Sequence, residues 1–258
     1  MDLRRTFDHQ ALLYDKARPT YPLDLFEKLV EITGIKTGDH LLEIGPGTGQ
    51  ATQPLAAKGY RITGVELGEH LAVVARHKLR HYPNIDIITG SFEKAELPAH
   101  EFQLVYSATA FHWIKPEVKY AKTHELLVPG GHLAVIHTNH VSDEEGDAFH
   151  VASQPIYDKY WPRGDKPAPA LPKASTLKAP DDLDEKLFKW VHFQSFPVVI
   201  DYTTEQYLEL RNTYSPTLSL PNDKREGFLQ ELGELIDSKF DGHRLKHFAM
   251  SLAIAQAI

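Results

Sequence analysis

Short apolar runs alternate with amphipathic segments through the first half of the chain. The apolar runs predict strands at 40–45, 61–65, 85–89, 102–107 and 131–139. Apolar residues at helical spacing predict helices at 8–16, 23–33, 50–58, 69–80 and 117–128. Strands that are apolar along their whole length and alternate with helices are typical of a parallel sheet covered on both faces. We therefore expect an α/β fold.

The pattern changes after Asn139. Prolines and polar residues dominate the segment 141–190, and its run K-P-A-P-A-L-P-K favours a loop over a regular element. Long irregular segments inside a compact domain are usually functional or mobile. We therefore interpret 141–190 as an inserted lid or substrate region.

The C-terminal part returns to regular structure. It predicts a strand at 190–202, single or broken at Pro197, and helices at 204–212 and 224–238. Residues 248–256 fit a strand or a helix by pattern, and an edge strand beside 190–202 fits better. The predicted division is therefore a core at 1–140, the insertion at 141–190, and 191–258 completing the same sheet.

Composition restricts the functions that the fold can serve. Lys and Arg number 28 against 35 Asp and Glu, a net charge of −7, so we expect no nucleic-acid partner. The chain has no cysteine, which excludes disulfides, thiolate nucleophiles and cysteine-bound metals. Two histidine pairs, His77 with His81 and His137 with His140, are close in sequence, but neither has a third ligand at useful spacing, so we expect no metal. No segment predicts a signal peptide or a membrane span, and we expect a cytoplasmic protein without a membrane partner.

The segment L-E-I-G-P-G-T-G at 42–49 carries the most information about chemistry. Gly45, Gly47 and Gly49 directly follow the first predicted strand, and glycine lets the backbone adopt positive φ and approach a ligand closely. The helix that follows would present free N–H groups and its positive dipole end to this loop.

Two cofactors compete for this loop, and an ordinary tight turn is a third interpretation. The dinucleotide fingerprint G-x-G-x-x-G needs a glycine where the chain has Gln50. Glu43, just before the first glycine, would repel a pyrophosphate but suits a ligand that carries an ammonium group. Glu66 ends the next strand 17 residues after Gly49, about where a carboxylate would meet ribose hydroxyls. The loop therefore matches S-adenosylmethionine better than NAD.

The order of motifs resembles that of class I S-adenosylmethionine-dependent methyltransferases over roughly residues 7–140. The opening segment resembles the A-x-x-Y-x-x-x-R-P-x-Y-P motif of their small-molecule branch, and 42–49 matches their first motif. Further similarity lies in G-S-F-E at 90–93, A-F-H-W at 110–113 and L-L-V-P-G-G-H-L at 126–133. Residues 202–215 resemble the trans-aconitate-methyltransferase-like subgroup.

This resemblance implies a Rossmann-like sheet of seven strands, the last antiparallel, with ligands at the carboxyl ends of the strands. Glu43 would face the methionine ammonium through water, and Glu66 would accept hydrogen bonds from the ribose hydroxyls. The other cofactor-binding positions it implies are the loop residues Gly45, Gly47, Thr48 and Gly49, the adenine neighbours Leu67, Ser91, Phe92 and Glu93, the residues Ser107 and Ala108 near the methionine backbone, and Tyr14, Arg18 and Tyr21, which would close over the cofactor.

Methyl transfer relies on orientation and a dry pocket more than on catalytic groups of the protein. An alcohol or amine acceptor benefits from a base, and His112, just past the fourth strand, is the candidate base. A packing or substrate-contacting role is the competing interpretation of His112. Trp113, Arg211 and Tyr214 are candidate substrate contacts, with Arg211 as a carboxylate clamp, and a solvent-facing arginine is the alternative.

The expected function is S-adenosylmethionine-dependent methyl transfer to a small-molecule acceptor, a carboxylate or hydroxyl-bearing metabolite. Two alternatives are a nucleotide-dependent oxidoreductase and a cofactor-binding protein without turnover. A macromolecular acceptor such as tRNA or protein is a further alternative, which the acidic charge disfavours for nucleic acid.

Overall fold

The computed structural model describes residues 10–143, 146–164, 166–167 and 169–258. The chain forms two compact units, each assembled from three segments. The sheet unit comprises Pro19–Asn139, Lys178–Phe196 and Met250–Ile258, and the helical unit comprises Met1–Arg18, His140–Leu177 and Pro197–Ala249. The division into 1–140, 141–190 and 191–258 stays a prediction.

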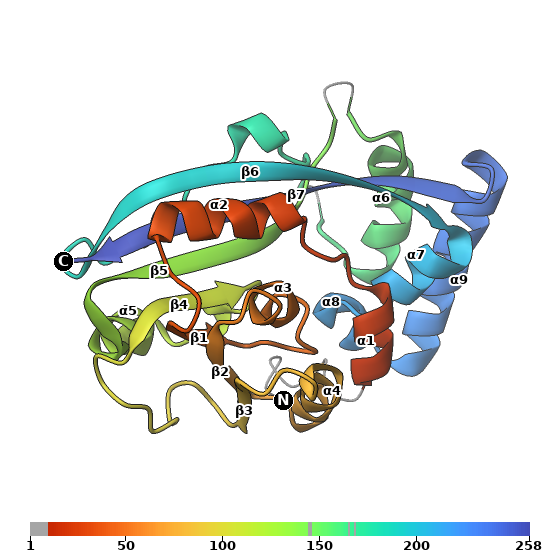
Figure 1. Cartoon of the computed structure of the whole chain (residues 1–258). Helices are drawn as coiled ribbons and strands as arrows, with labels where there is room; N and C mark the ends of the chain where they lie inside the picture. The colour runs from red at the N-terminus through yellow and green to blue at the C-terminus, as the bar shows by residue number, and fades with distance from the viewer. Residues whose placement is uncertain (1–9, 144–145, 165, 168) are drawn as a thin grey trace. The chain divides into compact units, whose positions relative to one another are not determined.

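The described strands form one sheet in the order β3-β2-β1-β4-β5-β7-β6 (Figure 1). They are β1 (His40–Ile44), β2 (Arg61–Glu66), β3 (Ile85–Thr89), β4 (Phe102–Ala108), β5 (Leu127–His140), β6 (Phe188–Thr203) and β7 (His243–Ala257). β1 to β5 pair in parallel, and the arrow of β7 runs opposite to those of β5 and β6. The order changes direction between β1 and β4, and ligands bind at such switch points, beyond the carboxyl ends of the strands.

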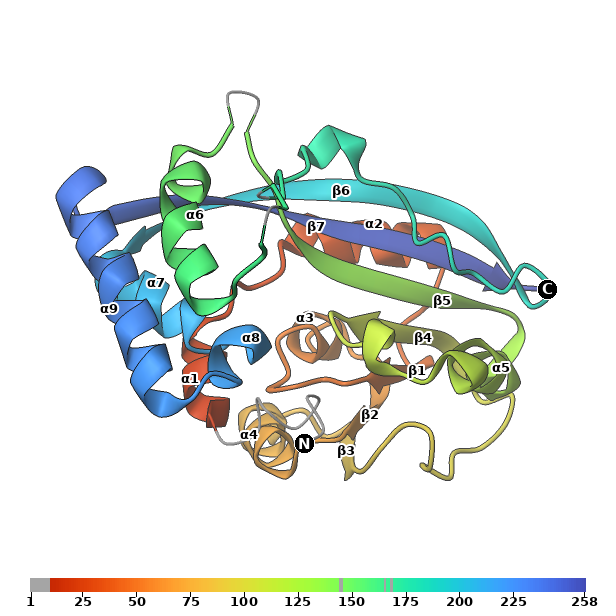
Figure 2. The same cartoon turned by 180° about the vertical axis from the view of Figure 1, so that it is seen from behind.

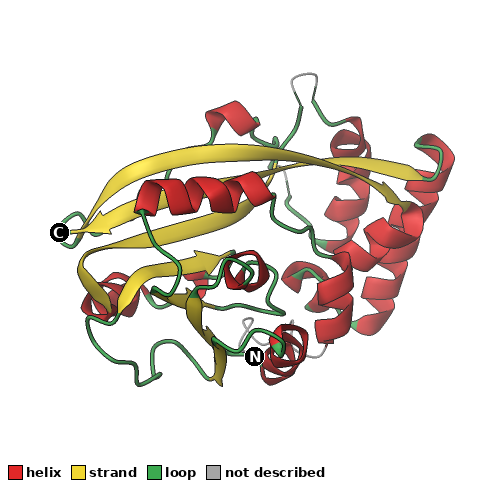
Figure 3. Cartoon of the chain, viewed as in Figure 1, coloured by secondary structure: helices red, strands yellow, loops and turns green. Residues whose placement is uncertain are grey.

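Helices of the sheet unit cover both faces of the sheet, as predicted. They are α2 (Leu23–Thr33), α3 (Thr52–Ala56), α4 (Glu69–Leu79), α5 (Pro116–Leu126) and the short η3 (Phe111–Trp113). Figures 1 and 2 view the sheet from opposite sides and show α2 over one face and α5 over the other, and Figure 3 separates helices from strands by colour. The main core cluster takes apolar side chains from several strands and from α5, among them Leu42, Phe102, Val105 and Leu126.

The helical unit is built from packed helices and the remaining parts of β6 and β7. Its helices are α1 (Ala11–Ala17), α6 (Ala148–Tyr160), η4 (Ala174–Thr176), α7 (Thr204–Arg211), α8 (Ser215–Leu218) and α9 (Asn222–Lys239). α6 and α7 pack against α9, and α1 packs against α7. Inside, the Phe149 ring lies 5.3 Å from the Tyr207 ring and 5.4 Å from the Phe240 ring. Thr203 and Gln206 form a capping box at the start of α7.

The edge of the sheet differs from the prediction. Residues 248–256 belong to β7, which lies between β5 and β6, so β6 is the edge strand and β7 an interior one. β6 is continuous through Pro197. An edge strand tolerates proline because half of its N–H groups have no partner strand.

Three helices also differ from the prediction. The segment 50–58 is helical only over Thr52–Ala56. The proline-rich insertion contains α6, which begins after the N-cap Asp147 and includes Pro155. The helix predicted at 8–16 corresponds to Ala11–Ala17, and residues 8 and 9 lie outside the described residues.

Candidate functional site

The loop after β1 has a backbone conformation that requires glycine. Gly45, Gly47 and Gly49 have φ angles of 69°, 59° and 90°. A Cβ on Gly45 would lie 2.5 Å from the Cβ of Ala110, so this glycine makes room for the segment after β4. Thr48 is fully buried. α3 begins only at Thr52 and has five residues, so its dipole adds little to the loop.

Glu66 connects the end of β2 to this loop. Its Oε2 accepts a hydrogen bond from the Gly47 N–H at 2.8 Å, and its Oε1 accepts one from the Gly68 N–H at 2.7 Å. Glu66 therefore ties the end of β2 to the glycine loop. Leu67, which follows, is half-buried.

Glu43 is completely buried within β1. Its Oε2 accepts hydrogen bonds from Thr52 Oγ1 at 2.6 Å and from the Tyr106 hydroxyl at 2.8 Å. Its Oε1 has no hydrogen-bond partner among the described residues. Burial raises the pKa of Glu43 to about 7; the two hydrogen bonds oppose this shift, and the nearby Glu66 adds to it. A buried acceptor without a donor fits the predicted approach of an ammonium group.

The turn after β3 contains the residues predicted to flank the adenine. Phe92 is 4% exposed and belongs to the main core cluster. The Nζ of Lys122 lies 5.2 Å from the centroid of its ring. Ser91 and Glu93 are half-buried, so these two present more side-chain surface to a ligand than Phe92 does.

The chain turns sharply at the end of β4, beside the glycine loop. Ser107 Oγ donates a hydrogen bond to the Ile44 carbonyl at 2.8 Å and so ties β4 to β1. Ala108 is half-buried. Thr109 has a φ of 59°, which is rare for a β-branched residue. Its Oγ1 lies 3.1 Å from the Tyr21 hydroxyl, which places Tyr21 at the carboxyl end of β4.

His112 and Trp113 lie in η3, just past β4. The exposed His112 ring lies 4.8 Å from the Trp113 ring and 5.8 Å from the ring of His137 on β5. Burial of part of the ring, followed by the nearby His137 and Lys119, lowers the pKa of His112. The imidazole is therefore neutral at pH 7, the form that accepts a proton.

Four of the predicted site residues lie in the helical unit. The Arg18 guanidinium lies 4.8 Å from the centroid of the Tyr14 ring and 4.3 Å from that of the Tyr214 ring. Its Nε donates to Thr213 Oγ1 at 2.9 Å. The Arg211 guanidinium lies 4.8 Å from the centroid of the Tyr214 ring. The structure thus brings Tyr14, Arg18, Arg211 and Tyr214 together, and places the other predicted residues in the sheet unit.

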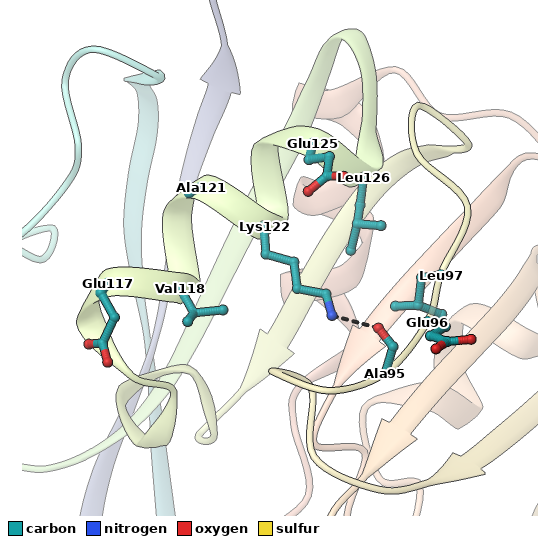
Figure 4. A pocket seen from close by; sticks show the side chains of 9 residues that line it. All are labelled: Ala95, Glu96, Leu97, Glu117, Val118, Ala121, Lys122, Glu125 and Leu126. Carbon is teal, nitrogen blue, oxygen red and sulfur yellow. Dashed lines mark hydrogen bonds between the residues drawn. The ribbon is translucent and has the colours of Figure 1, made fainter.

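A separate cavity of about 710 Å³ lies along α5 in the sheet unit (Figure 4). It is lined by Ala95, Glu96, Leu97, Glu117, Val118, Ala121, Lys122, Glu125 and Leu126, none of which is a predicted site residue. Lys122 Nζ donates to the Ala95 carbonyl at 2.5 Å, as the dashed line in Figure 4 shows.

Two observations concern metals and membranes. In the described part of the chain, no group of three His, Cys, Asp or Glu side chains is placed to hold a metal ion. None of the described helices is long and apolar enough to cross a membrane.

Several residues of the site were not predicted. Thr52 and Tyr106 donate to Glu43, and Thr109 and His137 lie at the ends of β4 and β5. Glu43 and Tyr106 are register partners on neighbouring strands, so a polar position in each of two apolar runs was a usable signal. Thr109 carried no such signal, because threonine rarely adopts positive φ.

Comparison with known proteins agrees with this geometry. Residues 42–135 match the family model described as a methyltransferase domain. An uncharacterised methyltransferase-like protein of Schizosaccharomyces pombe is 25% identical over 246 residues, covering 90% of this chain and 86% of that protein.

Solved structures show the same fold. A protein of Anaeromyxobacter dehalogenans assigned as a type II methyltransferase aligns with a TM-score of 0.63 and 23% identity, covering 93% of this chain and 97% of that one. A phosphoethanolamine N-methyltransferase of Haemonchus contortus, in complex with phosphomonomethylethanolamine and S-adenosylhomocysteine, aligns with a TM-score of 0.53 and 16% identity, covering 99% of this chain and 60% of that one. The chain described here is an S-adenosylmethionine-dependent methyltransferase with its methyltransferase domain in residues 42–135.

Proposed function

We propose that the chain transfers a methyl group to a small-molecule acceptor that bears a carboxylate or a hydroxyl group. Within this class we propose the trans-aconitate-methyltransferase-like branch, which residues 202–215 resemble. The observation that carries the cofactor assignment is the buried Glu43, whose Oε1 has no donor among the described residues. The Haemonchus contortus neighbour, whose complex contains a small phosphorylated amine, supports a small-molecule acceptor.

The residues of the sheet unit fit the cofactor. When bound, S-adenosylmethionine supplies an electrophilic methyl group on a sulfonium sulfur. We assign Glu43 to its ammonium group, because Glu43 Oε1 has no hydrogen-bond partner among the described residues. We assign Glu66 to its ribose hydroxyls, because this carboxylate ends β2 beside the glycine loop and accepts the Gly47 N–H. We assign the adenine to Leu67, Ser91 and Glu93, which are half-buried. The remaining loop and strand-end residues shape the space around the methionine part.

The proton of a hydroxyl acceptor would pass to His112. Its imidazole is neutral at pH 7 because its pKa is lowered, so a ring nitrogen would be able to accept the proton of a bound hydroxyl group. A carboxylate acceptor is already ionised at this pH and needs no base. Trp113, beside His112, is the proposed wall of the acceptor pocket. For Arg211 and Tyr214 a role in acceptor binding stays a prediction.

The proposal is tested by measuring methyl transfer from labelled S-adenosylmethionine to two sets of acceptors. One set contains trans-aconitate and a hydroxylated metabolite, and the other contains bulk tRNA and a protein mixture. We expect label in the small molecules only. Label confined to tRNA or protein would contradict the small-molecule acceptor. A thermal shift with NADH but not with S-adenosylhomocysteine would contradict the cofactor.

Replacing Glu66 by alanine should weaken S-adenosylhomocysteine binding by about 1–3 kcal/mol, the range for hydrogen bonds to a charged group. The loss has two sources, because Glu66 also holds the Gly47 N–H. Isothermal titration calorimetry measures the change. Glu69→Ala is the matched control, since Glu69 is exposed and begins the helix that follows β2. If the Glu66 variant and the wild type bound S-adenosylhomocysteine with equal affinity, Glu66 would not be a cofactor-binding residue.

Replacing His112 by alanine should lower turnover of a hydroxyl acceptor roughly 100-fold, the scale of general base catalysis, and leave cofactor affinity nearly unchanged. Turnover of a carboxylate acceptor should fall much less. Steady-state rates on both acceptors separate the two cases, with the exposed His77→Ala as control. Full activity of His112→Ala on a hydroxyl acceptor would exclude His112 as the base.

A further inference from the structure

Two arginines and a histidine surround Tyr214 in the helical unit. The guanidinium carbons of Arg18 and Arg211 lie 4.3 Å and 4.8 Å from the centroid of the Tyr214 ring. The His140 ring meets the same ring edge-on, at 5.5 Å between centroids. Three separate segments, the end of α1, the end of β5 and the end of α7, therefore meet at one aromatic side chain.

The same region carries more positive charge. Lys246 and Arg244 lie on β7, and each is 6% exposed. Burial lowers the pKa of His140 to about 3, with further lowering by the charges of Lys246, Arg211, Arg18 and Arg244. These four cations therefore lie close to one neutral, largely buried imidazole.

Only part of this charge is balanced. Asp147 forms an ion pair with Arg244 and also caps α6 by accepting the His150 N–H at 2.8 Å. Arg18 donates to the neutral side chain and carbonyl of Thr213, each at 2.9 Å. The ion pair accounts for Arg244, and it leaves the charge of Arg211 without a carboxylate partner. Burial, followed by the nearby Arg244 and Arg211, lowers the pKa of Lys246 to about 7, and Asp147 opposes this shift only in part.

Arg211 and Lys246 also have unused donors. Neither side chain makes a hydrogen bond or an ion pair with the residues that the structure describes. The Nε of Arg211 is buried without a partner. The hydroxyl of Tyr202, a side chain that is 7% exposed, is likewise buried without a partner. Leaving a buried donor unpaired costs about 1–3 kcal/mol, and more for a charged group. These two buried donors, together with the Lys246 ammonium that has no hydrogen bond among the described residues, indicate that something supplies the acceptors.

We propose that Arg211 and Lys246 bind the carboxylate or phosphate group of a small molecule. An oxyanion supplies both the negative charge and the acceptor atoms that these side chains lack, and a guanidinium binds such groups in a two-pronged manner. The rings of Tyr157, Tyr214 and Phe228 lie 5.3, 4.8 and 5.8 Å from the Arg211 guanidinium and give the site apolar walls. The proposal deepens the proposed function and rests on it, because Arg211 is already a predicted contact of a carboxylate acceptor.

The site is tested by calorimetric titration of the full chain with citrate and with inorganic phosphate, at fixed ionic strength in chloride buffer. We expect at least one of them to bind, and Arg211→Met and Lys246→Met each to bind it roughly 10–100-fold more weakly. Lys16→Met is the matched control, because Lys16 lies in the same unit but already has a carboxylate partner, Glu209, at 2.6 Å. Binding of citrate alone would show that the site takes a carboxylate group, and binding of phosphate alone would show that it takes a phosphate group.

Thermal melting without added anion separates a binding role from a structural one. Removing an uncompensated buried charge should leave the Tm of Arg211→Met equal to or above that of the wild type. A Tm of Arg211→Met clearly below that of the wild type would show that Arg211 stabilises the fold, and it would overturn the proposal. Failure of both anions to bind, or equal affinity in wild type and both variants, would overturn it as well. S-adenosylhomocysteine titrations of the same proteins report on the proposed function separately, because its predicted site lies in the sheet unit except for Tyr14 and Arg18, and includes neither Arg211 nor Lys246.

Discussion

Replacing Gly45 by alanine is expected to lower the free energy of unfolding by about 2–5 kcal/mol and to abolish measurable S-adenosylhomocysteine binding. Two costs combine at this position. A left-handed backbone costs roughly 1–2 kcal/mol for a residue with a Cβ, and Gly45 has a φ of 69°. The added Cβ would also lie 2.5 Å from the Cβ of Ala110, and overpacking of this kind costs about 1–3 kcal/mol.

Gly34 provides a matched control for this variant. It has a φ of 65° after α2, yet a Cβ there would meet no atom within 4 Å. Gly34→Ala should therefore show the backbone cost alone, about 1–2 kcal/mol, with cofactor binding intact. Combining Gly45→Ala with Ala110→Gly should recover the packing part of the loss. Urea denaturation and calorimetry measure these quantities, and equal losses for Gly34→Ala and Gly45→Ala would contradict the role of Ala110.

The second large effect depends on pH and comes from Glu43. Burial raises the pKa of this carboxyl from its ordinary 4.5 to about 7, so the folded protein holds a proton that the unfolded chain releases. The resulting stabilisation is fully present below pH 4.5 and is lost as the pH rises to about 7. A shift of this size corresponds to about 3 kcal/mol. Glu43→Gln has no carboxyl to ionise and should not show this loss.

The measurement is the difference in unfolding free energy between Glu43→Gln and the wild type, in half-unit steps from pH 4 to pH 8. It should move by about 3 kcal/mol in favour of the variant between pH 4.5 and 7, and then level off. Glu69→Gln, at an exposed position, should give a difference that is flat with pH. A flat difference for Glu43→Gln as well would show that the pKa of Glu43 is the same in the folded and the unfolded chain.

Much of the sheet was predictable because each strand is a local apolar run. β3 spans Ile85–Thr89, as its run of apolar residues indicates, and β1, β2 and β4 differ from their predicted bounds by a residue at one end. The interior place of β7 was not predictable in this way, because strand order depends on pairing between distant segments. α6 escaped prediction because its apolar pattern includes Pro155 and polar residues, while Phe149 is buried by contacts with Tyr207 and Phe240.

In the candidate site as well, features set by local sequence were predictable and contacts between distant segments were not. Gly45, Gly47 and Glu66 were predicted from local spacing, and the structure joins Gly47 to Glu66 through a hydrogen bond. The partners of Glu43 were not predicted, since they depend on the register of β1 with β4 and on the fold of the loop. The gathering of Arg18, Arg211 and Lys246 escaped prediction, because these residues are far apart in sequence and each alone is typical of a solvated surface.

The interleaving of the two units has a consequence for synthesis on the ribosome. Over the described residues the chain passes between the units five times, and the sheet unit receives its last segment at Met250–Ile258. Because β7 is the neighbour of β5 in the sheet, β5 has an open edge until the final residues are translated. At about 5–20 residues per second, the interval between residues 139 and 258 is roughly 6–24 s. During that time the nascent sheet presents an unpaired strand edge, a feature that makes partly folded chains prone to aggregation.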